Sequence, residues 1–372
     1  MNLIYLDTNA TAPIKPAVRA AMMEAMERHG NPSSAHRYGR IARRYVEDAR
    51  AAVAAMTGAK PAQVIFTAGG TEANNLILSN YASVYASAIE HDSVLAFVPP
   101  DNRLPVTRDG ILDLDAADAI LKNAPRGSLV SVMKVNNETG IIQPVATLAA
   151  LAKKYGHIVH ADAVQAAGRL PVDFAALGVD AMTVSGHKIG AAQGVGALIA
   201  RENLNLQPHM RGGGQERNRR AGTENVAGIV GLGVAAQLAA DDIRDMPRLA
   251  ALRDRLETVL SGIAGDDAIV IGNAVPRVAN TLSIALRGVN SETQVAAMDL
   301  SGVAVSAGSA CSSGKVKASH VLKAMGYAPD IAGCALRVSL GWHTSESDIM
   351  RCAEAWENLY RRTRAARTGK AA

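Results

Sequence analysis

The sequence predicts an α/β fold in which helices cover both faces of a mostly parallel β-sheet. Short apolar runs typical of buried strands occupy residues 63–67, 129–135 and 157–161, and further runs follow at 181–184 and 195–200. Segments with helical spacing of apolar side chains lie between them. This alternation indicates a parallel sheet, because two parallel neighbours are usually joined through a crossover helix.

The first predicted helices precede the first strand of this sheet. Residues 16–28 carry Val18, Met22 and Met26 at the spacing of one helix face. The Asn-Pro-Ser-Ser run at 31–34 ends that helix and offers an N-cap for the next one. The same spacing predicts further helices through residues 41–53, 76–78 and 148–155.

The last third of the chain predicts a second, smaller unit. Residues 225–260 are rich in alanine and helical in pattern, as expected of a connection between two units. Strand-like runs follow at 268–271, 281–285 and 336–339. Residues 361–372 are basic and small, and we expect them to form a frayed tail.

The charge composition argues against a nucleic-acid-binding protein. The 372 residues are 48% hydrophobic and 20% charged, with a net charge of only +5. The densest basic stretch, residues 211–220, is rich in glycine and contains no aromatic side chain. Binding to nucleic acids usually combines a basic face with aromatic rings for stacking, or a recognisable module.

The cysteines and the apolar runs indicate a cytoplasmic protein without a membrane anchor. Cys311, Cys334 and Cys352 are odd in number and far apart, so they form no disulfide framework and suggest a reducing compartment. The N-terminal residues do not have the pattern of a signal peptide. The apolar runs are too short or too interrupted for us to expect a span of the bilayer.

Polar clusters follow the predicted strands, where ligands bind in sheets of this kind. Gly69, Gly70 and Thr71 lie between a strand and a helix, which creates an anion site from free N–H groups. Taken alone, this motif fits a simple strand-to-helix turn better than an anion site. Asp162 ends another strand and could hold a protonated ring nitrogen, although a strand-end cap is the plain alternative.

The histidines near Asp162 raise the question of a metal site. His157 and His160 precede the carboxylate on the same predicted strand. Residues three apart on a strand point to opposite faces, so we do not expect these side chains to hold a metal together.

Two further residues have the chemistry of a covalent reaction. Lys188 follows a strand among small residues and beside His187, a setting that suits a Schiff base if burial lowers the lysine pKa. Taken alone, the same pattern fits a solvated loop lysine better. Cys311 lies in a run of Ser, Gly and Ala that cannot build a core, so an accessible, reactive thiol is expected. Cys334 and Cys352 have apolar surroundings and fit a core role.

Arg337 lies inside the strand-like run at 336–339 and needs an anionic partner. Its planar guanidinium matches a carboxylate with two parallel hydrogen bonds. That carboxylate could belong to an internal aspartate or to a substrate, and the residues alone leave both open.

Taken together, these segments resemble the cysteine desulfurases of the NifS and IscS kind, within the class V aminotransferase group. The resemblance covers nearly the whole chain, in the family's order. The matching segments are LDTNATAP (6–13), NPSSAH (31–36), AGGTEANN (68–75), EHDSV (90–94), VNNETGIIQP (135–144), HADAVQAAGRLP (160–171), SGHKIG (185–190), GGGQERNRRAGTEN (212–225), SAGSACSSG (306–314) and SHVLKAMG (319–326).

The resemblance implies a pyridoxal 5′-phosphate enzyme of fold type I that takes sulfur from L-cysteine and leaves L-alanine. Lys188 would bind the cofactor and move protons, and Cys311 would receive the sulfur as a persulfide. Asn136 and Arg337 would hold the substrate carboxylate. The remaining roles implied for the cofactor are the pyridinium partner Asp162, the ring-hydroxyl contact Gln165, the stacked and proton-shuttling His91, the phosphate ligands Gly70, Thr71, Ser185 and His187, and Thr223 from a second subunit.

The resemblance also implies the organisation of the molecule. Residues 15–255 would form the large cofactor-binding domain, and residues 1–14 and 256–372 the small domain with the cysteine loop. A homodimer is expected, with an iron–sulfur scaffold or another sulfur acceptor as partner. The long segment after Cys311 is similar to the long-loop branch of the family.

Alternatives remain at this stage. A selenocysteine lyase or an aminotransferase could use the same scaffold, and a catalytically silent scaffold could bind partners of sulfur transfer. One departure from the family pattern is Gly190-Ala191-Ala192-Gln193-Gly194, where the family has a Gly-Pro-Lys-Gly turn. Another is the pair Gly69-Gly70, where the family has Gly-Ala.

Overall fold

A seven-stranded sheet forms the centre of the larger unit in the computed structural model, which describes residues 3–308 and 318–368. The strand order is β2-β8-β7-β6-β5-β3-β4. All neighbouring pairs from β7 to β4 are parallel, and only β8 runs antiparallel to both its neighbours, which confirms the predicted sheet. The strands are β2 (Val64–Thr67), β3 (Val84–Ser87), β4 (Arg103–Leu104), β5 (Leu129–Met133), β6 (Ile158–Asp162), β7 (Ala181–Ser185) and β8 (Gly196–Ala200).

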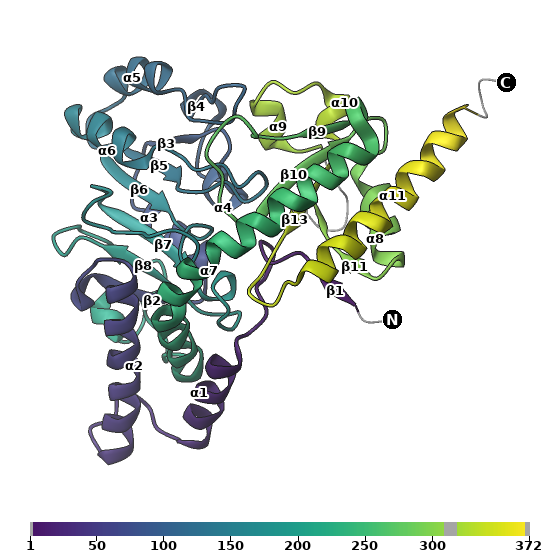
Figure 1. Ribbon diagram of the computed structural model, residues 1–372. Coiled ribbons are helices and arrows are strands. Elements are labelled where there is room, and N and C mark those ends of the chain that lie inside the picture. Colours follow the sequence, from purple (N-terminus) through teal and green to yellow (C-terminus); the bar gives the residue numbers. More distant parts are fainter. Residues whose placement is uncertain (1–2, 309–317, 369–372) are drawn as a thin grey trace.

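Helices cover both faces of this sheet (Figure 1). Successive residues of a strand point to opposite faces of the sheet: Phe66 packs in one core cluster, and Ile65 packs in another. The cluster around Ile65 includes side chains of α3 (Gly70–Leu78) and α4 (Asp92–Leu95). The larger cluster joins the other face to α1 (Pro16–Glu27), α2 (Arg37–Met56), α5 (Leu114–Asn123), α6 (Val145–Lys154) and the start of α7 (Val226–Ala264).

A second, antiparallel sheet builds the smaller unit, in the order β12-β13-β10-β9. Its core contains Trp356, which is fully buried against the sheet. The strands are β9 (Ala268–Val270), β10 (Thr281–Leu286), β12 (Ser306–Ala307) and β13 (Ala335–Ser339), beside the parallel pair β1 (Ile4–Tyr5) and β11 (Val303–Ala304). The helices are α8 (Ser291–Leu300), α9 (His320–Ala324), α10 (Pro329–Ala332) and α11 (Glu346–Thr368).

The C-terminal helix corrects one prediction. Residues 361–372 were expected to form a frayed tail, but α11 continues to Thr368. Arg361 pairs with Glu357 one turn earlier, and Thr363 donates from its Oγ1 to the carbonyl of Leu359 at 3.0 Å. The ion pair between residues four apart stabilises the helix beyond its buried part.

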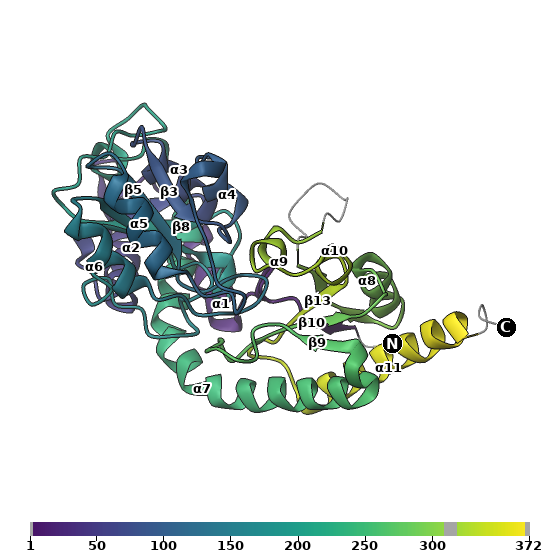
Figure 2. The ribbon, with the colours of Figure 1, turned by 90° about the horizontal axis from the view of Figure 1, so that it is seen from above.

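The 39-residue helix α7 joins the two units (Figures 1 and 2). Its first half packs against α1 and α2, and Leu249, Leu256 and Leu260 in its second half belong to the small core. By length and composition, residues 226–267 could also cross a membrane. Because both halves contact core elements, we interpret α7 as a core helix. The predicted domain boundary at residue 255 lies inside α7, and the division into two domains stays a prediction.

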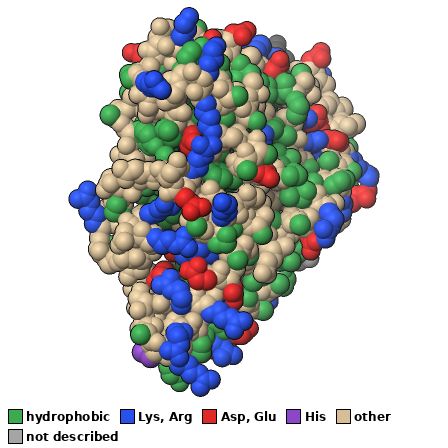
Figure 3. Space-filling model, turned by 90° about the vertical axis from the view of Figure 1, so that its left-hand side faces the viewer, with side chains coloured by type: hydrophobic (Ala, Val, Ile, Leu, Met, Phe, Trp, Pro, Cys, Tyr) green, Lys and Arg blue, Asp and Glu red, His purple; other side chains and the backbone are tan. Residues whose placement is uncertain are grey.

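Basic and acidic side chains are mixed over the face of the large unit in Figure 3. Lysine and arginine gather at its lower end, where Figure 1 places α2. Several of these arginines have acidic neighbours one turn away on α2, such as Arg44 with Asp48 and Arg43 with Glu47. The local excess of positive charge is therefore partly offset.

A buried ion pair anchors the glycine-rich segment that precedes α7. Glu216, Arg217 and Asn218 all adopt left-handed backbone conformations, with φ of 45°, 58° and 64°. Arg50 on α2 donates to both carboxylate oxygens of Glu216 at 2.8 Å. The N–H of Phe66 donates to the same carboxylate at 2.9 Å. Because three consecutive residues are strained, the segment depends on this pair to stay in place.

We predict that Glu216→Gln destabilises the protein by about 3 to 5 kcal/mol, because it removes the buried counter-ion of Arg50 and leaves only the partly exposed Glu47 beside that charge. The side chains of Arg50 and Glu216 are only 3% and 2% exposed. Urea unfolding followed by circular dichroism measures the loss. Glu47→Gln is the matched control: Glu47 also bonds Arg50, but its side chain is 42% exposed. That variant should lose no more than about 1 kcal/mol, and an equal loss in both variants would contradict the prediction.

Candidate active site

The polar clusters predicted at the strand ends surround one cavity of about 300 Å³. The carboxyl ends of parallel strands meet at one edge of a sheet, so residues distant in sequence come together there. Arg337 reaches the same cavity from β13 of the smaller sheet. The predicted residues that line it are Gly70, Thr71, His91, Asp162, Gln165, Ser185, His187, Lys188 and Arg337.

Asp162 ends β6 and is held by two hydrogen bonds. Its Oδ2 accepts from Asn74 Nδ2 at 2.9 Å, and its Oδ1 accepts from the N–H of Val164 at 2.9 Å. Asn74 also donates to Ser93 Oγ at 2.9 Å. The carboxylate is therefore fixed in place and only 6% exposed. Asn74 and Ser93 lie in motifs that the sequence singled out, but neither was predicted as a site residue.

His91 is positioned by the first turn of α4. The N–H of Ser93 donates to His91 Nδ1 at 3.1 Å, and Ser93 Oγ lies 2.9 Å from the same nitrogen. Because Nδ1 accepts the backbone hydrogen bond, a neutral His91 carries its proton on Nε2. The imidazole ring of His91 lines the cavity.

Lys188 lies directly after β7, at the end of a short 3-10 helix, Gly186–Lys188. Its Nζ donates to the carbonyl oxygens of Asn9 and, at 2.8 Å, Ala10. The N-terminal segment thus holds the ammonium group. Burial, helped by the charge of Lys188, lowers the pKa of the adjacent His187 to about 4, so His187 is neutral at pH 7.

The end of the cavity beside α3 has the features of an anion site. Gly70 and Thr71 begin α3, and Ser185 and His187 face the same opening. Among the described residues, the buried Ser185 Oγ has no hydrogen-bond partner. An N-terminal helix turn and an unused hydroxyl together suit a phosphate group.

Glycine at position 196 lets β8 pass close to this anion site. A Cβ at Gly196 would lie 2.8 Å from Gly69 Cα and 2.8 Å from the carbonyl oxygen of Val184. Both are backbone atoms, so no side chain could move aside to accept it.

The structure corrects the assignment of Asn136. Its side chain is fully buried, and its Oδ1 accepts from the N–H groups of Glu138 and Thr139 at 2.9 and 3.0 Å. Its Nδ2 donates to the carbonyl of Ile89 at 3.0 Å. These bonds fix the turn after β5 and leave the amide outside the cavity, which the neighbouring Asn137 lines instead. Asn137 is the better candidate for ligand contact.

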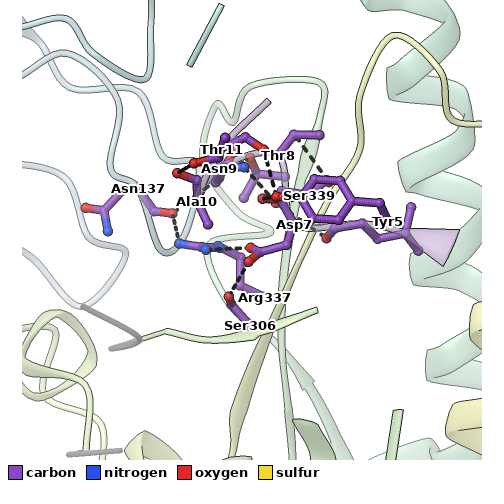
Figure 4. A network of polar contacts seen from close by, with 12 residues as sticks. Tyr5, Asp7, Thr8, Asn9, Ala10, Thr11, Asn137, Ser306, Arg337 and Ser339 are labelled. Carbon is purple, nitrogen blue, oxygen red and sulfur yellow. Dashed lines mark hydrogen bonds and ion pairs between the residues drawn. The ribbon is translucent and has the colours of Figure 1, made fainter. Parts of the chain in front are cut away.

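Arg337 has an internal carboxylate partner, Asp7 (Figure 4). Its Nη2 donates to Asp7 Oδ1 at 2.7 Å, and its Nη1 donates to the carbonyl of Asn137 at 3.0 Å. Ser306 Oγ donates to the other Asp7 oxygen at 2.7 Å. The Nε of Arg337 is buried and has no partner within the described part of the chain. Arg337 therefore pairs with an aspartate and lines the cavity as well.

The remaining predicted residues differ in their surroundings. Gln165 Nε2 donates to the carbonyl of Asn9 at 3.0 Å, and its Oε1 accepts from Arg169. Thr223 is exposed and lies in a separate hollow beside Arg220, outside the cavity of its own chain. Cys311 lies outside the described residues.

The other two cysteines are buried. Cys334 is 6% exposed and Cys352 is 1% exposed. Burial raises the pKa of the Cys352 thiol to about 12. Both fit the core role that their surroundings predicted.

His160 lies in the sheet beneath the cavity, two residues before Asp162. Its Nδ1 is 2.8 Å from Ser131 Oγ, and its Nε2 is 2.9 Å from Thr183 Oγ1. Burial lowers the pKa of His160 to about 4, although the nearby Asp162 charge acts in the opposite direction. His157 points elsewhere, with its Nε2 2.9 Å from the carbonyl oxygen of Leu121. The two histidines therefore serve separate contacts.

We predict that His160 makes the protein less stable as the pH falls from 6.5 towards 4. In this window the unfolded chain binds a proton that the folded chain does not. The free energy of unfolding therefore decreases by about 1.4 kcal/mol for each pH unit that the pH falls. Urea unfolding at pH 7 and pH 5 measures the difference. His160→Gln should reduce the difference in unfolding free energy between pH 7 and pH 5 by about 2 kcal/mol. The exposed control His209→Gln should keep the wild-type difference. Equal pH dependence in both variants would contradict the assignment.

Known proteins resemble this chain along almost its whole length. The class-V aminotransferase family model matches residues 4–352. An IscS-like cysteine desulfurase of Mycobacterium tuberculosis is 40% identical, covering 98% of both chains. A cysteine desulfurase of Gluconacetobacter diazotrophicus is 40% identical, covering 98% of this chain and 95% of that protein.

Solved structures agree in fold. A NifS-like protein from Rickettsia africae superposes with a TM-score of 0.90 at 36% identity, covering 97% of this chain and 100% of that one. A structure described as SspA in complex with cysteine has a TM-score of 0.77 at 27% identity, covering 91% of this chain and 98% of that one. This chain belongs to the class-V aminotransferase family, a family of pyridoxal-phosphate enzymes.

Proposed function

We propose that this chain is a cysteine desulfurase, which takes sulfur from L-cysteine, leaves L-alanine and carries the sulfur as a persulfide on Cys311. The observation that carries the proposal is the single cavity that gathers Lys188, Asp162 and Arg337. Relatives named cysteine desulfurase, 40% identical along nearly the whole chain, support the same reaction. The neighbour described as in complex with cysteine supports the substrate.

The residues around the cavity fit pyridoxal phosphate. The unused Ser185 hydroxyl, with Gly70, Thr71 and the neutral His187, would hold the phosphate. Asp162 would pair with the ring nitrogen, because its carboxylate is fixed by two donors and lines the cavity. The contacts that remain are Lys188 with the aldehyde group, Gln165 with the ring hydroxyl and His91 with the face of the ring. Bound pyridoxal phosphate supplies an electron sink for the substrate carbon atoms.

Arg337 and Asn137 would hold the substrate. Arg337 is 4% exposed, and its guanidinium can bind the cysteine carboxylate through charge-assisted hydrogen bonds. Asn137 lines the cavity beside it and offers a side-chain amide. Lys188 would then take the proton from the substrate α-carbon, since carbonyl groups of Asn9 and Ala10 fix its Nζ beside the cavity.

Cys311 would complete the reaction by attacking the substrate sulfur as a thiolate. A sulfur–sulfur bond forms as the carbon–sulfur bond breaks, and the bonding electron pair stays with the substrate carbon. That carbon takes up a proton, and Lys188 would return the proton to the α-carbon, which gives alanine. A thiolate is the competent nucleophile here, because a serine hydroxyl is not ionised at neutral pH.

The proposal includes a homodimer in which Thr223 contacts the cofactor phosphate of the neighbouring subunit. The position of Thr223, exposed and outside the cavity of its own chain, supports this homodimer. Met23 and Met26 on α1 are 56% and 63% exposed, and the second subunit would cover these apolar side chains. The protein would act in the cytoplasm and pass sulfur to an iron–sulfur scaffold or another acceptor protein. We retain residues 15–255 and residues 1–14 with 256–372 as its two domains, since each unit has its own sheet.

We predict that Cys311→Ser abolishes sulfur transfer but still binds cofactor and cysteine. Brief exposure to cysteine should add about the mass of one sulfur atom to the wild type, because the thiolate is the sulfur acceptor. Intact mass spectrometry and alanine release measure the step, and visible absorbance measures cysteine binding. Cys334→Ala, which removes a buried thiol, is the control and should still gain sulfur on Cys311. Normal alanine release by Cys311→Ser would rule out this mechanism.

We predict that Arg337→Lys raises the KM for cysteine by about tenfold to a hundredfold, because an ammonium group cannot replace the planar fork. Steady-state alanine production at several cysteine concentrations measures KM and kcat separately. Arg277→Lys is the matched control, since Arg277 is also buried and paired, with Glu257 at 2.9 Å, but lies outside the cavity. An unchanged KM in Arg337→Lys would make Arg337 a structural partner of Asp7 alone.

A further inference from the structure

The carboxylate of Glu138 lies between two residues that are distant in sequence. Ser319 Oγ donates a hydrogen bond to Glu138 Oε2. On the other side, a Cβ added to Gly308 would lie 2.5 Å from the same oxygen, so the glycine backbone packs directly against the carboxylate. One buried oxygen thus contacts both Gly308 and Ser319.

Glu138 is fixed in a rigid turn beside the substrate-binding arginine. It is 3% exposed, and its N–H donates to Asn136 Oδ1 at 2.9 Å. The carbonyl of the preceding residue, Asn137, accepts from Arg337 Nη1 at 3.0 Å. Burial raises the pKa of Glu138, while Ser319, His320 and Arg337 act in the opposite direction. The Glu138 carboxylate therefore belongs to the same rigid turn whose Asn137 carbonyl binds Arg337.

Ser319 has a second contact that makes it a firm anchor. Its Oγ accepts from the N–H of Leu322 at 3.1 Å and so caps the start of α9. The Nε2 of the next residue, His320, lies 3.0 Å from the carbonyl oxygen of Glu90. This contact places the start of α9 against the loop that carries His91.

Gly308 and Ser319 flank the part of the chain that contains Cys311. Cys311 is only three residues after Gly308 in the sequence, so Gly308 is its nearest described attachment point on the N-terminal side. A nucleophile that must meet a bound substrate gains rate when its attachment point is fixed, and a displacement of 1 Å can cost about a hundredfold.

We propose that Glu138 is a positioning residue for sulfur transfer, which holds both chain ends of the cysteine segment against the wall of the substrate site. The inference rests on the proposed function, because it assigns Cys311 as the sulfur acceptor. Glu138 acts through Gly308 and Ser319, and its side chain does not line the cavity. It should therefore affect the transfer step and leave cofactor and cysteine binding unchanged.

A double-mutant cycle tests the contact between Glu138 and Gly308. Gly308→Ala puts a methyl group where the carboxylate lies, and Glu138→Ala removes the carboxylate. Each should slow the gain of sulfur on Cys311 by about tenfold or more. Adding Gly308→Ala to Glu138→Ala should cost less than about twofold, because the clash is gone. Single-turnover mixing with cysteine, acid quench and intact mass measure the rate.

Two binding measurements and two further variants separate positioning from a general structural role. Cofactor content and the dissociation constant for cysteine, from visible absorbance, should stay within about twofold of wild type in all variants. Gly262→Ala is the matched glycine control, because a Cβ there meets no atom within 4 Å. Ser319→Ala removes only the hydroxyl and should also slow the transfer.

The outcomes are distinct. A wild type that gains no sulfur on Cys311 would refute the proposed function itself. A wild type that gains sulfur at the same rate as the variants would overturn the role of Glu138 and leave the function standing. Additive effects of the two alanine substitutions would also overturn it, as would equal losses of cofactor and of transfer rate in Glu138→Ala.

Discussion

The active site depends on the hydrogen bonds of one residue near the N-terminus, Asn9. It is 2% exposed, and its N–H donates to Ser339 Oγ at 3.0 Å in the smaller sheet. Its side-chain amide donates to Thr281 Oγ1 at 3.0 Å, again in that sheet. Its carbonyl accepts from Gln165 and from Lys188, which follow β6 and β7 of the larger sheet. A buried residue with its polar groups satisfied in this way allows little movement, so Asn9 fixes the two units relative to each other at the cavity.

The sequence predicted those features that local pattern determines. The run at residues 129–133 is buried at every position and pairs in parallel with both neighbouring strands, and the alternation of such runs with helices is typical of parallel sheets. Once the sheet is parallel, its strand ends must share an edge. The positions of Asp162 and Lys188 at that edge follow from the sheet alone, before any relative is considered.

The features that were missed depend on contacts between distant parts of the chain. Asn136 and Asn137 are adjacent and identical in type, and only the hydrogen bonds of the turn decide which amide faces the cavity. Asn9 lies 179 positions from Lys188, and no periodicity in the sequence relates the two. The helical continuation of α11 rests on pairs such as Arg361 with Glu357, whereas the composition of that segment suggested fraying.

The surroundings of Arg337 explain how one guanidinium would serve both the fold and, in the role proposed for it, the substrate. A buried cation without a counter-ion would be costly, and Asp7 supplies the carboxylate whether or not a substrate is bound. Ser306 holds the second oxygen of Asp7, so this carboxylate is not free to follow a moving guanidinium. The Nε of Arg337 is buried without a partner among the residues that the structure describes. The pair with Asp7 therefore holds Arg337 at the cavity wall in advance, so binding of the proposed substrate carboxylate would not have to order the guanidinium.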